Sequence, residues 1–396
     1  MLIVVVLVAC APVEVAGPTQ RAFVSPSATS TPIGGTVPSP TPTPASDLRF
    51  AAIQRLNDAV GFVWTWEHGL AKTADGGVSW KPIALPALAV QAPSLRFVDE
   101  AVGWVTGFTP RDVPQVACQQ APPRPSKPCY GVVLKTSDGG RTWNQVFSIE
   151  TTLVTGEPVR SLQAIDGTRA WIVTEASCDS TGCTSDLQRT TDGGATWLKL
   201  YRGKIDAVRF ATPTRGWMVS TPGAHRVEVR ATSDGGATWS PPFTVSGDFV
   251  TVDAASRDVA WFLAGDGAYC TSSTCSRYEL FRTRDGGSTW MSLGNPPRPA
   301  ACASGHLAGP LFASGTRGWL GANLGAGGAE GSTGTLGTND GGSTWTCSPA
   351  PMNVALMSAA DPDHLWAVSI RTTPETLWSS DDGGTTWRAI DLSSLR

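Results

Sequence analysis

Seven aspartates recur in one short motif, Thr/Ser-x-Asp-Gly-Gly-x-Ser/Thr-Trp, at intervals of 42 to 63 residues. Repeated carboxylates can ligate metals, transfer protons or accept hydrogen bonds within a turn. The Ser380-Asp381-Asp382-Gly383 copy looks like the start of a calcium loop, but it lacks the further oxygen ligands that such a loop needs. A structural role is therefore favoured over metal binding or catalysis. The seven aspartates are Asp75, Asp138, Asp192, Asp234, Asp285, Asp340 and Asp382.

Each motif has the composition of a tight turn that its own side-chain hydrogen bonds hold closed, which we call a stapled turn. The Asp carboxylate can accept hydrogen bonds from backbone N–H groups just downstream, the glycines can adopt positive φ, and the Ser/Thr hydroxyl adds a local bond. The closing tryptophan buries apolar surface while its indole N–H requires a carbonyl. These tryptophans are Trp80, Trp143, Trp197, Trp239, Trp290, Trp345 and Trp387.

A second aromatic residue recurs in every repeat and helps to define the strands that each turn connects. Phe62 in the first copy, and a tryptophan in the others, follows an apolar strand and a short turn. A variable loop, a third strand, the Asp-Gly-Gly turn and a fourth strand starting at the motif tryptophan come next. Four strands per unit, repeated seven times without helical periodicity, predict an all-β, seven-bladed β-propeller over residues 48–396. The other aromatics are Trp104, Trp171, Trp217, Trp261, Trp319 and Trp366.

The motif resembles the BNR/Asp-box repeat of bacterial sialidases, sortilin-type receptors and the photosystem II assembly-factor family. The Asp-Gly-Gly-x-Thr-Trp form and the Gly-Trp turn before it are most similar to the assembly-factor family. That resemblance implies a non-catalytic, chaperone-like binder of membrane protein subunits, without cofactor or metal. Sialidases combine six blades, an arginine triad and a Tyr/Glu nucleophile pair with an Arg-Ile-Pro motif, which this chain lacks. A sialidase-like or other glycoside hydrolase is the alternative.

The N-terminus predicts export and lipid anchoring. Residues 1–10 end in Leu-Val-Ala-Cys, which resembles a lipobox with Cys10 as the lipidated residue, although no Lys or Arg precedes the apolar run. Residues 11–47 are rich in Pro, Ser and Thr and predict an extended spacer. We therefore expect a monomeric, extracytoplasmic protein that contacts the membrane only through its lipid. A net charge of −3 gives no support to nucleic-acid binding.

Eight cysteines remain once Cys10 is set aside. Three pairs each close a connection between strands two and three of one blade, and the last pair falls in the sixth blade. Disulfides agree with an exported protein, whereas the spacing lacks the Cys-x-x-Cys or histidine pattern of structural zinc. The predicted pairs are Cys118–Cys129, Cys178–Cys183, Cys270–Cys275 and Cys302–Cys347.

Loop lengths predict a binding face. The turn between strands one and two and the Asp-Gly-Gly turn keep constant lengths, whereas the strand-two-to-three loops and the blade connections vary. Variable loops on a rigid scaffold are where binding usually resides. We therefore expect these loops to bind a protein or cell-envelope ligand, although the simpler interpretation is that the long loops are tolerated and have no function.

Three further groups are candidates for binding. Because successive side chains of a strand point to opposite faces, Arg96, Arg209 and Asp253 are predicted to line the central channel. There they form either a site that binds an anion or carboxylate, or a solvated channel wall. Arg169, Arg215 and Arg317, with His364, occupy equivalent turns and form either a basic arc for an acidic partner or solvated turn residues. Trp64, Trp66 and Trp378 lie outside the repeated positions, where they either pack a seam or stack on a sugar.

Overall fold

The computed structural model describes residues 48–396, apart from 87–93, 110–128, 152–157, 180–181, 267–269, 272–273, 276, 298, 300–301, 303–305, 324–332, 349–350, 352, 371–374 and 396. The predicted signal peptide, Cys10 and the spacer lie outside this range. Among the described residues, no helix is long and apolar enough to cross a membrane.

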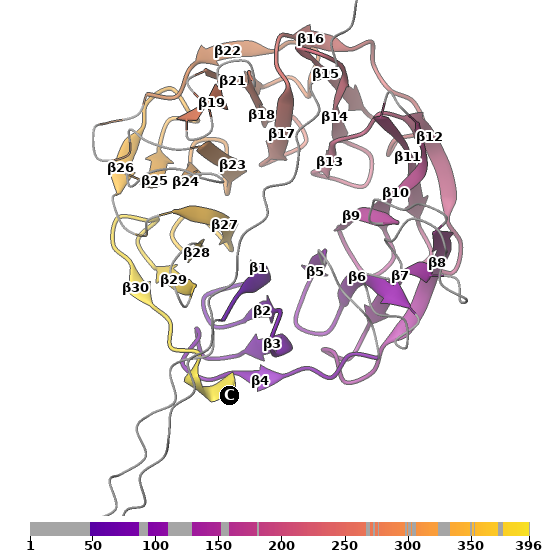
Figure 1. Ribbon diagram of the computed structural model, residues 1–396, viewed down its shortest axis with the longest axis vertical. Coiled ribbons are helices and arrows are strands. Elements are labelled where there is room, and N and C mark those ends of the chain that lie inside the picture. The colour runs from indigo at the N-terminus through magenta and orange to yellow at the C-terminus, as the bar shows by residue number, and fades with distance from the viewer. Residues whose placement is uncertain are drawn as a thin grey trace, which may run out of the picture. The chain divides into compact units, whose positions relative to one another are not determined.

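Seven four-stranded antiparallel sheets form the predicted propeller (Figure 1). Blade 1 contains β1 (Phe50–Arg55), β2 (Gly61–Thr65), β3 (Gly69–Thr73) and β4 (Lys81–Pro82). Blade 2 contains β5 (Leu95–Phe97), β6 (Gly103–Thr109), β7 (Cys129–Thr136) and β8 (Asn144–Thr151). Blade 3 contains β9 (Val159–Ala164), β10 (Ala170–Asp179), β11 (Gly182–Thr190) and β12 (Leu198–Gly203).

The remaining blades repeat this order. Blade 4 contains β13 (Ala207–Phe210), β14 (Gly216–Gly223), β15 (Arg226–Thr232) and β16 (Phe243–Val245). Blade 5 contains β17 (Phe249–Ala254), β18 (Ala260–Gly265), β21 (Tyr278–Thr283) and β22 (Met291–Gly294), with the hairpin β19 (Cys270–Thr271) and β20 (Thr274–Cys275) inserted. Blade 6 contains β23 (His306–Phe312), β24 (Gly318–Asn323), β25 (Gly334–Thr338) and β26 (Thr346–Ser348). Blade 7 contains β27 (Val354–Ala359), β28 (Leu365–Ser369), β29 (Thr376–Ser380) and β30 (Arg388–Ala389), before the 3-10 helix η3 (Ser393–Leu395).

The first strands of successive blades contact one another in chain order, and β27 contacts β1 to close the ring. Figure 1 shows these strands innermost. Each blade takes all four strands from one continuous stretch of chain, so among the described residues no strand is exchanged between blades 7 and 1. Ring closure therefore depends on side-chain contacts and on a backbone hydrogen bond from Glu375 N to Leu48 O at 3.2 Å.

The Asp-Gly-Gly turns have the predicted geometry, as the third copy illustrates. The hydroxyl of Thr190 donates to Asp192 Oδ1 at 2.8 Å and accepts from Gly194 N at 2.8 Å. Thr196 donates its backbone N–H to Asp192 Oδ1 at 2.9 Å and its hydroxyl to Oδ2. The other six turns make the same four bonds. Both glycines have positive φ in every copy, which only glycine adopts readily.

Each Asp-Gly-Gly turn is tied to the strand-one-to-two turn of its own blade. The first glycine N–H donates to a carbonyl there, as Gly193 does to Thr168 O at 2.9 Å and Gly76 to Ala59 O at 2.7 Å. This bond recurs in all seven blades. The two turns of constant length therefore lie on one face, and the variable loops emerge on the other.

The motif tryptophan belongs to the turn, which corrects one expectation. In six blades the fourth strand begins at the residue after this tryptophan, and in blade 4 it begins at Phe243. The indole N–H of Trp143 donates back to Gly140 O at 3.2 Å, and Trp345 and Trp387 make the equivalent bond. These three indoles are bonded within their own turn, whereas Trp197 donates to Val146 O of the preceding blade at 2.8 Å.

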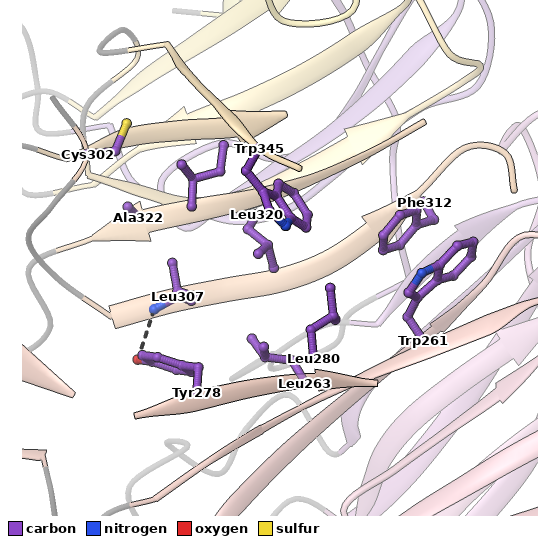
Figure 2. Packing of buried hydrophobic residues seen from close by; sticks show 11 residues of the cluster. Trp261, Leu263, Tyr278, Leu280, Cys302, Leu307, Phe312, Leu320, Ala322 and Trp345 are labelled. Carbon is purple, nitrogen blue, oxygen red and sulfur yellow. Dashed lines mark hydrogen bonds between the residues drawn. The ribbon is translucent and has the colours of Figure 1, made fainter. Parts of the chain in front are cut away.

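The most deeply buried aromatics are the strand-two residues, which pack between blades. All six strand-two tryptophans and Phe62 have no exposed surface. Phe97 stacks on Phe62 of the preceding blade at 3.6 Å between ring centroids, and Phe210 stacks on Trp171 at 4.0 Å. Figure 2 shows the third such stack, Phe312 on Trp261 at 3.6 Å, within the cluster shared by blades 5 and 6.

Polar donors from one blade also reach the Asp-Gly-Gly turn of the next. Trp171 Nε1 and the Arg189 guanidinium both donate to Gly235 O, and Trp261 and Arg282 do the same to Gly341 O. Equivalent donors are found at six junctions. The remaining bonds run from Lys135 to Gly193, Arg215 to Gly286, Arg317 and Trp319 to Gly383, and Arg388 to Gly76.

Arg55 completes the ring between blades 1 and 7. Its side chain is only 2% exposed and lies over the Trp366 ring. The guanidinium donates to Ser380 O at 2.8 Å and to the Ser379 hydroxyl at 3.1 Å, and it pairs with Asp381 at 2.6 Å. Together with the Arg388–Gly76 hydrogen bond and the apolar cluster that blades 1 and 7 share, this buried cation joins the two ends of the propeller.

We expect Arg55→Met to destabilise the propeller by about 2–4 kcal/mol, because it removes several charge-assisted hydrogen bonds and leaves buried carbonyl groups unsatisfied. Arg49→Met is the matched control. Arg49 forms an exposed pair with Glu67 at 3.1 Å, and such surface pairs contribute about 0–1 kcal/mol. Urea unfolding measures both changes. Equal losses in the two variants would contradict the role of Arg55 in the seam.

The turns also predict an acid-labile fold. The Thr196 hydroxyl and backbone N–H lower the pKa of Asp192 to about 2, and the pKa of each of the other six motif aspartates is likewise about 2. Because the unfolded carboxyls have the ordinary, higher pKa, the unfolded chain binds more protons between about pH 4 and pH 2. The stabilisation should be complete above pH 4 and be lost as the pH falls to about 2. This loss of stability can be measured as the melting temperature of the wild type and of an Asp192→Asn/Asp285→Asn variant across this pH range. The melting temperature of the variant should depend less steeply on pH, because two of the seven titrating carboxyl groups are absent.

Candidate functional site

Polar strand-one residues connect the blades around the middle of the ring. Gln54 exchanges two hydrogen bonds with the backbone of Phe97, at 2.6 and 2.7 Å. Gln163 accepts from Phe210 N at 2.7 Å, and Asp253 accepts from Phe312 N at 2.6 Å. Several positions that the sequence places on the channel wall therefore serve first as connections between blades.

The structure brings Arg96, Arg209 and Asp253 into one electrostatic neighbourhood, although they belong to blades 2, 4 and 5. Arg209 Nε pairs with Asp253 Oδ1 at 2.8 Å. Arg96 Nε donates to Ala164 O at 3.3 Å. Burial, followed by the positive charge of Arg209, lowers the pKa of Arg96 to about 10, and Asp253 offsets this only in part. Two guanidinium groups against one carboxylate leave this cluster with an excess positive charge.

The expected basic arc does not form a free surface. Arg215 and Arg317 are half-buried, and both donate to carbonyls of the following blade. Arg169 is exposed and pairs with Asp166 at 2.7 Å, while His364 pairs with Asp361 at 2.8 Å. Arg169 is thus a solvent-exposed turn residue, as one of the two interpretations expected, whereas Arg215 and Arg317 connect neighbouring blades.

The three tryptophans outside the repeat have separate environments. Trp64 is buried in the cluster between blades 1 and 2 rather than at the seam. Trp66, in the β2–β3 turn on the variable face, is 40% exposed. Trp378 lies in β29 and is half-buried. No ring contact between Trp66 and Trp378 is found among the described residues, so a two-ring sugar platform gains no support.

The cysteines are described only in part. Cys302 and Cys347 form a disulfide within blade 6. Cys183 is also disulfide-bonded, and the backbone of Cys178 lies opposite it in the β10–β11 pair. Cys270 and Cys275 are backbone partners in the β19–β20 hairpin. Cys118 and the side chain of Cys129 lie outside the described residues.

Carboxyl groups suited to acid–base chemistry are separated in the described part of the chain. Burial raises the pKa of Glu175 in blade 3 and of Glu375, which precedes β29 in blade 7. Glu375 accepts from Phe50 N at 2.8 Å and so connects blades 7 and 1. Neither residue lines the cavity of about 650 Å³ beside Lys72 and Arg141, or the cavity of about 330 Å³ beside His225 and Tyr278.

The second of these cavities was missed by the sequence interpretation. His225 and Asp266 line this cavity, and Asp248 lies beside them, although His225 and Asp266 are 41 positions apart in the sequence. The four histidines, His68, His225, His306 and His364, fall in separate repeats, so the sequence does not group them. Only the packing of blade 4 against blade 5 brings His225 to two carboxylates.

Comparison with known proteins places the chain by fold. No protein-family model matches it, and no curated protein matches its sequence. The structure of YCF48 bound to a D1 peptide is 18% identical, with a TM-score of 0.53 over 85% of this chain and 94% of that chain. YCF48 from Cyanidioschyzon merolae is 17% identical, with a TM-score of 0.52 over 87% of this chain and 95% of that chain.

An enzyme has a similar fold. The Niastella koreensis GH74 enzyme is 12% identical, with a TM-score of 0.54 over 87% of this chain but only 54% of its own. At these identities the similarity establishes a seven-bladed propeller that is structurally close to YCF48. Because binding proteins and enzymes share this fold, the fold does not choose between them.

Peptide mapping under non-reducing conditions should recover Cys118–Cys129, Cys178–Cys183 and Cys270–Cys275 beside Cys302–Cys347. The three local pairs close short loops, so reduction should loosen the variable face before it lowers the melting temperature of the propeller. Bridges between blades, or free thiols at Cys178 and Cys183, would contradict this arrangement.

Proposed function

We propose that this chain is a non-catalytic binding scaffold that works outside the cytoplasm, anchored through Cys10, and that it recognises an anionic segment of a protein. The observation that carries the proposal is the excess positive charge of the Arg96–Arg209–Asp253 cluster. A half-buried guanidinium whose pKa is lowered by desolvation and by a second cation is stabilised when an anion binds beside it. A carboxylate ligand fits this site, because guanidinium groups bind carboxylates through paired hydrogen bonds.

The comparisons support the same class of function. A neighbour of similar fold, YCF48, is described as bound to a D1 peptide. The variable loops lie on one face of a scaffold whose opposite face is held by identical turns. Such a scaffold can present different loops to a partner without changing its core.

Glycoside hydrolysis is the second candidate, because the GH74 enzyme has a similar fold. That chemistry requires two carboxyl groups flanking one bond in a shared cleft. The two described carboxyls with raised pKa values lie in blades 3 and 7 and line neither described cavity. The arrangement therefore favours binding.

Isosteric variants of the cluster test the proposal. Binding to an array of acidic peptides, each with its Asn/Gln counterpart, should weaken at least about tenfold in Arg96→Gln and Arg209→Gln, since each removes a cation from the site. Asp253→Asn should bind acidic peptides more tightly than wild type. Its amide oxygen can still accept from Phe312 N, but the competing negative charge is gone.

Two results would contradict the proposal. One is peptide binding that is insensitive to Arg96→Gln and Arg209→Gln. The other is turnover of fluorogenic sialosides or glucosides by the purified protein, lost when Glu175 is replaced by Gln. Circular dichroism and the melting temperature of each variant report whether the fold is retained.

A further inference from the structure

Three potential metal ligands converge on the variable face where blades 4 and 5 meet. His225 lies in the tight turn between β14 and β15, Asp248 directly precedes β17, and Asp266 directly follows β18. The ligand atoms of all three lie within 4.8 Å of one another. They come from three different loops, so their meeting is a product of blade packing.

The distances fit a small divalent cation. His225 Nδ1 lies 3.1 Å from Asp248 Oδ1 and 3.7 Å from Asp266 Oδ1. Tetrahedral Zn²⁺ with bonds of about 2.0–2.1 Å places its ligand atoms about 3.3 Å apart, between these two values. Small side-chain rotations would complete the coordination.

The backbone holds the ligands in place. His225 has a φ of 54°, a left-handed conformation that residues other than glycine rarely adopt, and its N–H donates to Asp248 Oδ1 at 3.0 Å. Asp248 N donates to Gly265 O at 2.8 Å, and Asp266 N donates to Arg277 O at 3.2 Å. The backbone N–H of each ligand residue therefore donates a hydrogen bond to a neighbouring segment, which fixes the three loops relative to one another.

The charge and the space around the group also suit a cation with an open coordination position. Two carboxylates balance a divalent charge when the imidazole is neutral. The adjoining cavity of about 330 Å³ is lined by Ser246, Arg277, Tyr278 and Glu279 as well as by His225 and Asp266. Three protein ligands beside such a cavity leave a position for water or an external ligand, whereas closed structural sites use four protein ligands.

We infer that His225, Asp248 and Asp266 form a divalent metal site, of the Zn²⁺ class, on the variable face. The bound ion would link the β14–β15 hairpin of blade 4 to the base of the β19–β20 hairpin in blade 5. It would also present a Lewis-acidic centre to a ligand that enters the cavity. This site is independent of the arginine cluster of the proposed function.

Metal titration of the full, tag-free chain tests the site. After treatment with EDTA and dialysis, the protein should take up one equivalent of Zn²⁺ in competition with a chromophoric indicator. His225→Asn and Asp266→Asn should each lower the affinity at least about tenfold, because each removes one of three ligands. His364→Asn is the matched control and should bind like wild type, since His364 pairs with Asp361 alone.

The variants retain all nine cysteines, so thiol-bound metal would remain in every one of them. Zn²⁺ binding that His225→Asn and Asp266→Asn leave unchanged, or no stoichiometric uptake by wild type, would overturn the inference. Co²⁺ gives a second readout. Visible bands without a thiolate charge-transfer band support a nitrogen and oxygen site, whereas a thiolate band places the metal at the cysteines and refutes the assignment.

Discussion

The connection of each blade to the next is the constraint on which the rest of the structure depends. A single four-stranded sheet cannot bury two apolar faces, so every blade requires neighbours on both sides. At six junctions a donor of one blade reaches a glycine carbonyl in the Asp-Gly-Gly turn of the next, as Trp261 does with Gly341. The stacked aromatic pairs reinforce three junctions, and at the seam Arg55 adds its hydrogen bonds to that of Arg388 with Gly76. The repeated turn thus stabilises its own blade and also accepts hydrogen bonds from the preceding one.

This arrangement separates the stabilising turns from the two proposed sites. The turns of constant length and their hydrogen bonds occupy one face, and the loops that vary in length occupy the other. The arginine cluster lies on the innermost strands, where Arg96 donates to Ala164 O of the next blade and Arg209 forms an ion pair with Asp253. The His225 group lies on the loop face, at a junction between two blades. Both sites draw residues from more than one blade, and neither requires a change in the stapled turns.

Several features were predictable because they are local. The aspartate, hydroxyl and glycine positions of each turn lie within seven residues, so their types and spacing determine hydrogen bonds such as those of Asp192. The number of blades follows from the number of repeats. The fourth strand was expected to start at the motif tryptophan, whereas in six blades it starts one residue later, as at Asn144 after Trp143. The spacing of the motif does not determine this residue, because the start of the strand depends on its pairing with strand three, as Asn144 pairs with Lys135.

The sequence by itself determined the repeat, the strand order within each blade, the stapled turns and the constant and variable faces. Only the tertiary structure decided which residues meet across blades. It joined Arg209 to Asp253, directed Arg215 and Arg317 onto neighbouring turns, and brought His225 to two aspartates. The physical reason is the separation in sequence between the residues that interact. Turn and strand geometry depends on residues a few positions apart, whereas contacts between blades depend on side-chain size and charge at positions that lie in different repeats, which no single repeat encodes.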